Sequence, residues 1–190
     1  SDLRAPGILC AGPRRAFSQL AASYRSRLPV PVVGITGSCG KTTTKDMLAS
    51  LLSVHRRVVA SPASYNNDIG VPHTVLSADA SCETLVVEMG TNAPGEIEAL
   101  CRTAQPSAAI VTNAGSAHLP GLGREAGAAQ EKAPPPARIA PGAWVVLNAA
   151  CGRRDTVRAR SPAGRATLRT HHRAAARPPP APRPDDQPPR

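Results

Sequence analysis

The chain has 190 residues, of which 41% are hydrophobic and 19% are charged, and its formal net charge is +10. This length favours one domain with a sizeable core. The sequence contains no run of about 18 apolar residues, as a membrane-spanning helix requires. Its five cysteines are scattered without a C-x-x-C pair, which argues against a disulfide framework or a structural zinc site and fits a cytoplasmic location.

The first predicted elements are a helix, a strand and a second helix. Residues 8–28 contain a helical pattern, and the apolar run at 30–35 predicts a buried strand. After a glycine-rich turn, a helix is predicted over 42–54. Its core face is expected to consist of Met47, Leu48, Leu51 and Leu52.

The rest of the pattern alternates between strands and one further helix. Apolar and β-branched runs predict strands at 57–60, 84–87, 108–112 and 144–147, and a helix over 95–103. Such alternation is typical of α/β proteins with a parallel sheet. We therefore expect an α/β fold whose strands are buried on both faces.

The turn after the first strand has the composition of a phosphate-binding loop. Its residues are Thr36, Gly37, Ser38, Cys39, Gly40, Lys41, Thr42 and Thr43. In such a loop, backbone N–H groups and a helix N-terminus face the phosphates, the lysine adds a full charge and the next hydroxyl faces Mg²⁺. Ile35 stands where the common pattern has a glycine, but the shorter Thr-Gly-x-x-Gly-Lys-Thr form is present. Nucleotide chemistry is the first hypothesis, an ordinary turn is the plainer one, and Cys39 receives no catalytic role.

Polar residues also follow two other predicted strands. Glu88 follows one strand, and Asn113 follows another, with His118 five residues later. The carboxyl ends of parallel strands meet at one edge of a sheet. A carboxylate, an imidazole and a phosphate loop are therefore expected in one region, which favours a nucleotide and metal site.

Several motifs together resemble the Mur ligase family. They are residues 34–46, Asn-Asn-Asp-Ile-Gly-Val-Pro at 66–72, Glu-Met-Gly at 88–90 with Pro-Gly-Glu-Ile at 94–97, and Thr-Asn at 112–113 with Ala-His-Leu at 117–119. The resemblance implies the P-loop central domain of that family and an ATP-dependent ligase of peptidoglycan precursor synthesis. The motifs are most similar to the branch that adds D-alanyl-D-alanine to UDP-N-acetylmuramoyl-tripeptide, so these two molecules are the implied substrates.

The resemblance also implies roles for individual residues. Residues 36–43 would bind ATP, and Lys41 would neutralise its β and γ phosphates. Thr42 and Glu88 would hold the Mg²⁺ that bridges those phosphates, an ion that prefers oxygen ligands.

A second metal position and a substrate contact are implied in the same way. His118 matches a family histidine near a second Mg²⁺, and Lys132 matches a family lysine that becomes carbamylated. The implied catalytic residues are thus Lys41, His118 and Lys132. Asn66 and Asn67 resemble the family's substrate-side loop.

Each of these positions also has a plainer interpretation. Glu88 would be a solvated loop carboxylate, and His118 a surface or core histidine. Asn66 and Asn67 would serve a turn, because Asn tolerates left-handed geometry. Lys132 would be an ordinary exposed lysine.

Composition and resemblance divide the chain into three parts. Residues 1–28 resemble the end of the family's N-terminal UDP-substrate domain, and residues 29–150 resemble part of its ATP-binding central domain. Residues 151–190 hold 10 Arg, 3 acidic residues and 8 Pro, which predicts a disordered tail. The tail has no aromatic residue for base stacking, so specific nucleic-acid binding is a weaker hypothesis.

Other functions stay open beside the ligase hypothesis. The resemblance covers about residues 8–148, only part of a complete ligase, so an ATP-binding fragment without ligase activity is one alternative. Another Mur-type ligase is a second. A different P-loop enzyme leaves the Asn66–Asn67 and Glu88–Gly90 motifs unexplained. We expect a monomer.

Overall fold

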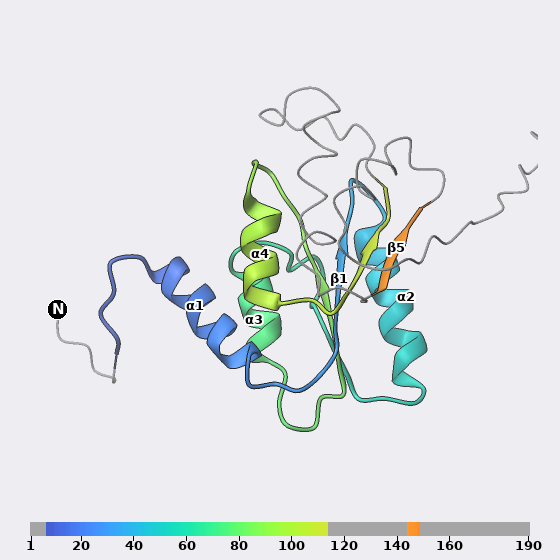
Figure 1. Ribbon diagram of the computed structural model, residues 1–190, viewed down its shortest axis with the longest axis horizontal. Helices are drawn as coiled ribbons and strands as arrows, with labels where there is room; N and C mark the ends of the chain where they lie inside the picture. The colour runs from blue at the N-terminus through green and yellow to red at the C-terminus, as the bar shows by residue number, and fades with distance from the viewer. Residues whose placement is uncertain (1–6, 114–143, 149–190) are drawn as a thin grey trace, which may run out of the picture.

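The computed structural model describes residues 7–113 and 144–148 (Figure 1). In chain order the elements are α1 (Pro13–Arg25), β1 (Val32–Thr36), α2 (Lys41–Ser53), β2 (Val58–Ala60), α3 (Gly70–Leu76), β3 (Thr84–Glu88), α4 (Glu96–Ala104), β4 (Ala108–Val111) and β5 (Trp144–Leu147). The predicted tail at 151–190 lies outside the described residues. None of the helices within residues 7–113 has the length and apolar composition that a bilayer span requires.

The five strands form one sheet in the order β2-β3-β1-β4-β5, and each neighbouring pair is parallel. The predicted parallel α/β fold is therefore confirmed. Strand β1 is central, with β3 and β4 on either side of it. The carboxyl ends of these three strands meet at one edge of the sheet, where open α/β sheets bind ligands.

The two faces of the sheet are covered differently. Helices α1, α3 and α4 lie together on one face, and α2 lies on the opposite face (Figure 1). Side chains alternate along a strand, so each strand contributes to both faces. Leu85 and Val87 of β3 belong to the core on the side of the three helices, whereas Val86 and Glu88 point the other way.

The main core lies between the sheet and these three helices. Strands β1 and β3 bring fully buried residues to it, and α3 and α4 bring most of the others. Its buried members are Ala21, Val32, Val71, Val75, Ala78, Cys82, Leu85, Val87, Met89, Ile97, Leu100, Cys101 and Ala104. A smaller cluster at Ala109, Val111, Val145 and Leu147 joins β4 to β5.

A buried arginine attaches α1 to the rest of the fold. Arg25 donates hydrogen bonds to four carbonyl oxygens, those of Leu28 (2.6 Å), Ala104 (3.0 Å), Val30 (3.1 Å) and Gln105 (3.4 Å). Burial lowers the pKa of this guanidinium because it loses hydration, although an arginine keeps its charge in proteins. One side chain thus satisfies carbonyls at the end of α4 and ahead of β1.

The helix predicted over 42–54 is present, but the core face assigned to it is wrong in part. Met47 and Leu51 are 62% and 68% exposed, while Leu48 and Leu52 are half-buried. The buried residue of α2 is Lys45. Polar groups near the carboxyl ends of the strands attract this lysine to the sheet, so the inward stripe of α2 is partly polar.

Helix α3 was not predicted from the sequence. It contains Gly70 and Pro72, which are poor helix formers, and two β-branched valines, Val71 and Val75. Pro72 is tolerated because it lies in the first turn, where an N–H has no intrahelical partner. Both valines are fully buried, so tertiary packing stabilises this short helix.

Candidate functional site

The glycine-rich loop joins the central strand β1 to α2. Gly37 has a φ of +144°, and a Cβ at this position would collide with Thr112 Oγ1. Gly40, directly before α2, has a φ of +78°. Both conformations favour glycine, so the two glycines of the motif are required by the backbone.

The end of β4 holds the loop in shape. Asn113 Oδ1 accepts hydrogen bonds from the backbone N–H of Ser38 (2.7 Å) and of Cys39 (3.1 Å). The Thr112 hydroxyl donates to the Cys39 carbonyl (2.7 Å). The sequence placed Asn113 at a strand end but did not predict that it and Thr112 organise the loop.

The start of α2 provides positive charge. Among the described residues, no side chain caps this helix end. The Lys41 ammonium donates to the Gly37 carbonyl at 3.1 Å, so it lies over the loop. A helix N-terminus carries partial positive charge, and its first N–H groups lack intrahelical partners. The loop, the helix end and Lys41 together form an arrangement suited to a phosphate.

Glu88 ends β3 beside the loop, since it pairs with Ile35 of β1. Its side chain is buried, so the interpretation as a solvated loop carboxylate is wrong. Oε1 accepts a hydrogen bond from Asn66 Nδ2 (2.9 Å), but Oε2 is buried without a partner among the described residues. The Thr36 hydroxyl oxygen is also buried without a hydrogen-bond partner in the described part of the chain.

These oxygens fit a hard cation. An unpartnered buried carboxylate oxygen is costly unless a cation compensates it. Within residues 7–113 and 144–148, no three His, Cys, Asp or Glu side chains gather into a preformed metal cluster. Mg²⁺ needs only one or two carboxylates when phosphates and waters complete its shell. The site therefore suits a magnesium ion that arrives with a nucleotide.

The two consecutive asparagines differ in their contacts. The carbonyl of Asn66 accepts from the N–H of Gly90 (2.8 Å), and a Cβ at Gly90 would lie 2.8 Å from Asn66 Cγ. Asn67 Oδ1 accepts from the N–H groups of Ile69 (3.1 Å) and Gly70 (2.9 Å), ahead of α3. Asn66 thus approaches the carboxylate, and Asn67 shapes the turn into α3.

A cavity of about 440 Å³ lies next to the loop. Five of the sequence-predicted residues line it: Gly37, Ser38, Lys41, Asn66 and Asn67. Six do not: Thr36, Cys39, Gly40, Thr42, Thr43 and Glu88. His118 and Lys132 lie outside the described residues.

The cavity also contains residues that the sequence did not indicate. Thr91 and Asn92 line it, and Glu96 Oε2 accepts hydrogen bonds from the N–H of Asn92 (2.6 Å) and of Ala93 (3.1 Å). Arg14 of α1 reaches the cavity from the far end of the sequence. Thr91 and Asn92 follow Glu88 past a strand end, which is a usable signal, whereas nothing local marks Arg14.

A parallel α/β sheet with a glycine-lysine loop between its central strand and the next helix defines the P-loop class of fold. Comparison with known proteins narrows this class. The family model named "Mur ligase middle domain" matches residues 35–175, and the chain belongs to the Mur ligase family. The matched range includes the first part of 151–190, where the motifs had shown no resemblance.

Curated relatives of the chain are named UDP-N-acetylmuramoyl-tripeptide–D-alanyl-D-alanine ligase. The one from Bacillus subtilis is 46% identical over 117 residues, which is 62% of this chain and 26% of that protein. The one from Escherichia coli is 40% identical over 131 residues, 69% of this chain and 29% of that protein. The chain thus spans less than a third of the length of these two relatives.

Solved structures agree with this relationship. MurF from Acinetobacter baumannii superposes with a TM-score of 0.82 at 30% identity, over 88% of this chain and 38% of that one. MurF ligase from Thermotoga maritima, in complex with ADP, superposes with a TM-score of 0.76 at 30% identity, over 86% of this chain and 39% of that one.

Proposed function

We propose that this chain acts in an ATP-dependent ligase that joins D-alanyl-D-alanine to UDP-N-acetylmuramoyl-tripeptide. The observation that carries the proposal is that the loop containing Lys41 lies beside the buried carboxylate of Glu88. One Glu88 oxygen is held by Asn66, while the other has no partner among the described residues. The identity of 40–46% to ligases of that name supports the choice of substrates.

The chemistry needs charge neutralisation more than covalent help. A carboxylate is a poor electrophile until it is phosphorylated, and phosphoryl transfer depends on positioning and electrostatic stabilisation. Residues 36–43 would hold ATP, and Lys41 would neutralise the oxygens of the transferred phosphate. Thr42 and Glu88 would hold Mg²⁺, which when bound would neutralise phosphate charge.

The other assignments rest on the family relationship. His118 and Lys132 are proposed for a second Mg²⁺, and Asn66 and Asn67 for contact with the UDP-linked peptide. We assign residues 29–150 to the ATP-binding domain and 1–28 to the substrate domain that precedes it. The proposed reaction is cytoplasmic and the protein is taken to be a monomer.

Nucleotide binding is the first test. Titration of the chain with Mg-ADP should give measurable affinity, and Lys41→Ala should weaken it by about tenfold or more, because a charged hydrogen bond to phosphate is lost. Arg56→Ala is the matched control, since it removes an exposed positive charge just after α2. Equal binding by the wild type and Lys41→Ala, or no binding by either, would refute the phosphate-loop assignment.

A second candidate is nucleotide binding without ligation. It is favoured by the fraction of the Bacillus subtilis ligase that this chain spans, 26%. Phosphate release, measured with UDP-N-acetylmuramoyl-tripeptide and D-alanyl-D-alanine separately and together, distinguishes the two. Release that requires both substrates supports the ligase, and release that neither substrate changes supports the second candidate.

A further inference from the structure

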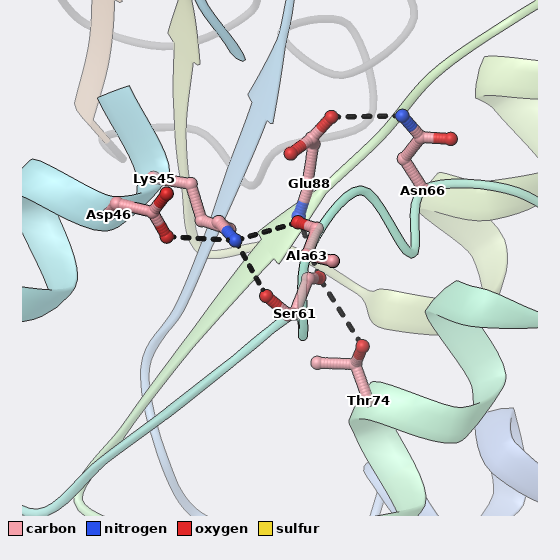
Figure 2. Close-up of polar contacts among 7 residues, drawn as sticks. All are labelled: Lys45, Asp46, Ser61, Ala63, Asn66, Thr74 and Glu88. Atoms are coloured by element: carbon pink, nitrogen blue, oxygen red, sulfur yellow. Dashed lines mark hydrogen bonds and ion pairs between the residues drawn. The ribbon is translucent and has the colours of Figure 1, made fainter. Parts of the chain in front are cut away.

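A buried lysine in α2 has no role in the proposed reaction. Lys45 is 2% exposed, and its ammonium has three acceptors (Figure 2). These are the carbonyl oxygens of Ser61 (2.8 Å) and Ala63 (2.8 Å) and Asp46 Oδ1 (2.9 Å). A lysine ammonium has three N–H donors, so each one has a partner.

Lys45 lies one helical turn after Lys41, so both lysines project from the same side of α2. The segment that Lys45 holds runs from β2 toward α3 and includes Asn66. Lys45 therefore connects the helix of the phosphate loop to the segment that reaches Glu88.

Ser61 transmits this contact to the carboxylate strand. Its carbonyl accepts from Lys45, and its Oγ accepts a hydrogen bond from the backbone N–H of Glu88 at 3.0 Å. Its own N–H donates to the carbonyl of Val86 (3.0 Å). The hydroxyl of Thr74 in α3 lies 3.3 Å from Ser61 Oγ. Ser61 is thus fixed between α2, β3 and α3, as Figure 2 shows.

Ala63 makes the turn that follows. Its φ is +43°, a left-handed conformation that residues other than glycine rarely adopt. Such a conformation persists only where the surroundings enforce it, and the Lys45 ammonium bound to its carbonyl is one such constraint. Beyond the turn, Asn66 donates to Glu88 Oε1.

We propose that Lys45 is a positioning residue for the carboxylate site. By holding Ser61 and Ala63 it fixes the segment that presents Asn66, and so sets how Glu88 is oriented when a cation and a nucleotide bind. All three ammonium donors of Lys45 are taken by protein acceptors, so Lys45 would act through these contacts. The effect on cation and nucleotide binding rests on the proposed function. The tether, which is the pair of hydrogen bonds from Lys45 to the carbonyls of Ser61 and Ala63, can be tested without any ligand.

Hydrogen exchange of the full chain tests the tether. Lys45→Met removes all three donors and keeps an unbranched side chain. We expect exchange at residues 61–67 and 88–90 to accelerate about tenfold or more, because charge-assisted hydrogen bonds are lost. Exchange in 13–25 and 96–104 should stay unchanged. Faster exchange throughout the chain would mean that Lys45 only stabilises the fold, which overturns the proposal.

The consequence for the site is tested with ADP, in the presence and absence of Mg²⁺. Without Mg²⁺, Lys45→Met should bind ADP as tightly as the wild type. The factor by which Mg²⁺ raises the ADP affinity should be about tenfold smaller than in the wild type, because Glu88 is no longer oriented. Asp46→Ala is the matched control, since it removes the exposed third acceptor and leaves both carbonyl bonds. An unchanged Mg²⁺ gain in Lys45→Met, or an equal loss with and without the metal, overturns the proposal.

Ser61→Ala covers the case in which Lys45→Met does not fold. It removes the hydroxyl that joins the tethered segment to Glu88 and keeps the bonds of Lys45. The same loss of Mg²⁺ gain is expected, and an unchanged gain would contradict the proposal. If the wild type binds no ADP, the proposed function fails, but the hydrogen exchange of Lys45→Met or Ser61→Ala still tests the tether. Faster exchange only at residues 61–67 and 88–90 supports the tether, and equally faster exchange throughout the chain overturns it.

Discussion

The two faces of the sheet are built from different interactions. On the side of α1, α3 and α4, buried apolar side chains form a continuous core. On the side of α2, the helix buries one residue, Lys45, and leaves Met47 and Leu51 exposed. The same strands therefore support a continuous apolar core on one face, while on the other a network of polar contacts lies beside buried apolar strand residues such as Val86.

This difference follows from where the polar groups of the site lie. Glu88 faces α2 at the carboxyl end of β3, and buried polar groups must be hydrogen-bonded. Ser61 Oγ accepts from the backbone N–H of Glu88, Lys45 holds the Ser61 carbonyl, and Asn66 donates to one oxygen of the carboxylate. We conclude that the three-helix face contributes most of the stability, while the α2 face contributes the geometry of the site.

The largest effect expected from this comparison is that of Leu85→Ala. Leu85 lies in β3 and is fully buried in the core between the sheet and the three helices. Its truncation should lower the free energy of unfolding by about 3 kcal/mol, because both transfer energy and a cavity are involved. Urea unfolding measures this value, with the half-buried Leu48→Ala in α2 as control. Equal losses from the two variants would contradict the division between the faces.

Arg25→Met should have the next largest effect. The substitution keeps an apolar stem but removes the donors for the carbonyls of Leu28, Val30 and Ala104. We expect a loss of about 2 kcal/mol, since buried acceptors lose their partner. Thermal unfolding measures it, and Arg27→Met, at an exposed neighbour, is the control. No difference between the two would mean that the hydrogen bonds of Arg25 do not stabilise the attachment of α1.

The strands were predictable because their signal is local. Runs such as 30–35 and 84–87 are rich in apolar and β-branched residues, as is typical of strands buried on both faces. Helix α3 was not predictable, because Gly70 and Pro72 argue against a helix and the burial of its valines depends on distant elements. The inward face of α2 was misassigned because the partners of Lys45, Ser61 and Ala63, follow it by 16 and 18 residues.

The candidate site divides in the same way. Gly37, Lys41 and Glu88 could be predicted as candidates because each residue type has a known chemistry at a strand end or a helix start. The support that Asn113 gives to the loop spans 75 residues of sequence, and no pattern in a single sequence reveals a hydrogen bond at that separation. Arg14 reaches the cavity for a similar reason, through the packing of α1.

Leu51→Gln is expected to have the smallest effect and tests the α2 face most directly. Leu51 is 68% exposed, so a polar side chain of similar length should change the free energy of unfolding by less than about 0.5 kcal/mol. Urea unfolding beside Leu85→Ala supplies the comparison. A loss of about 1 kcal/mol or more would show that the Leu51 side chain is covered in solution. The exposed side of α2 would then contribute apolar burial of its own, and the division of stability between the two faces would be weaker than proposed.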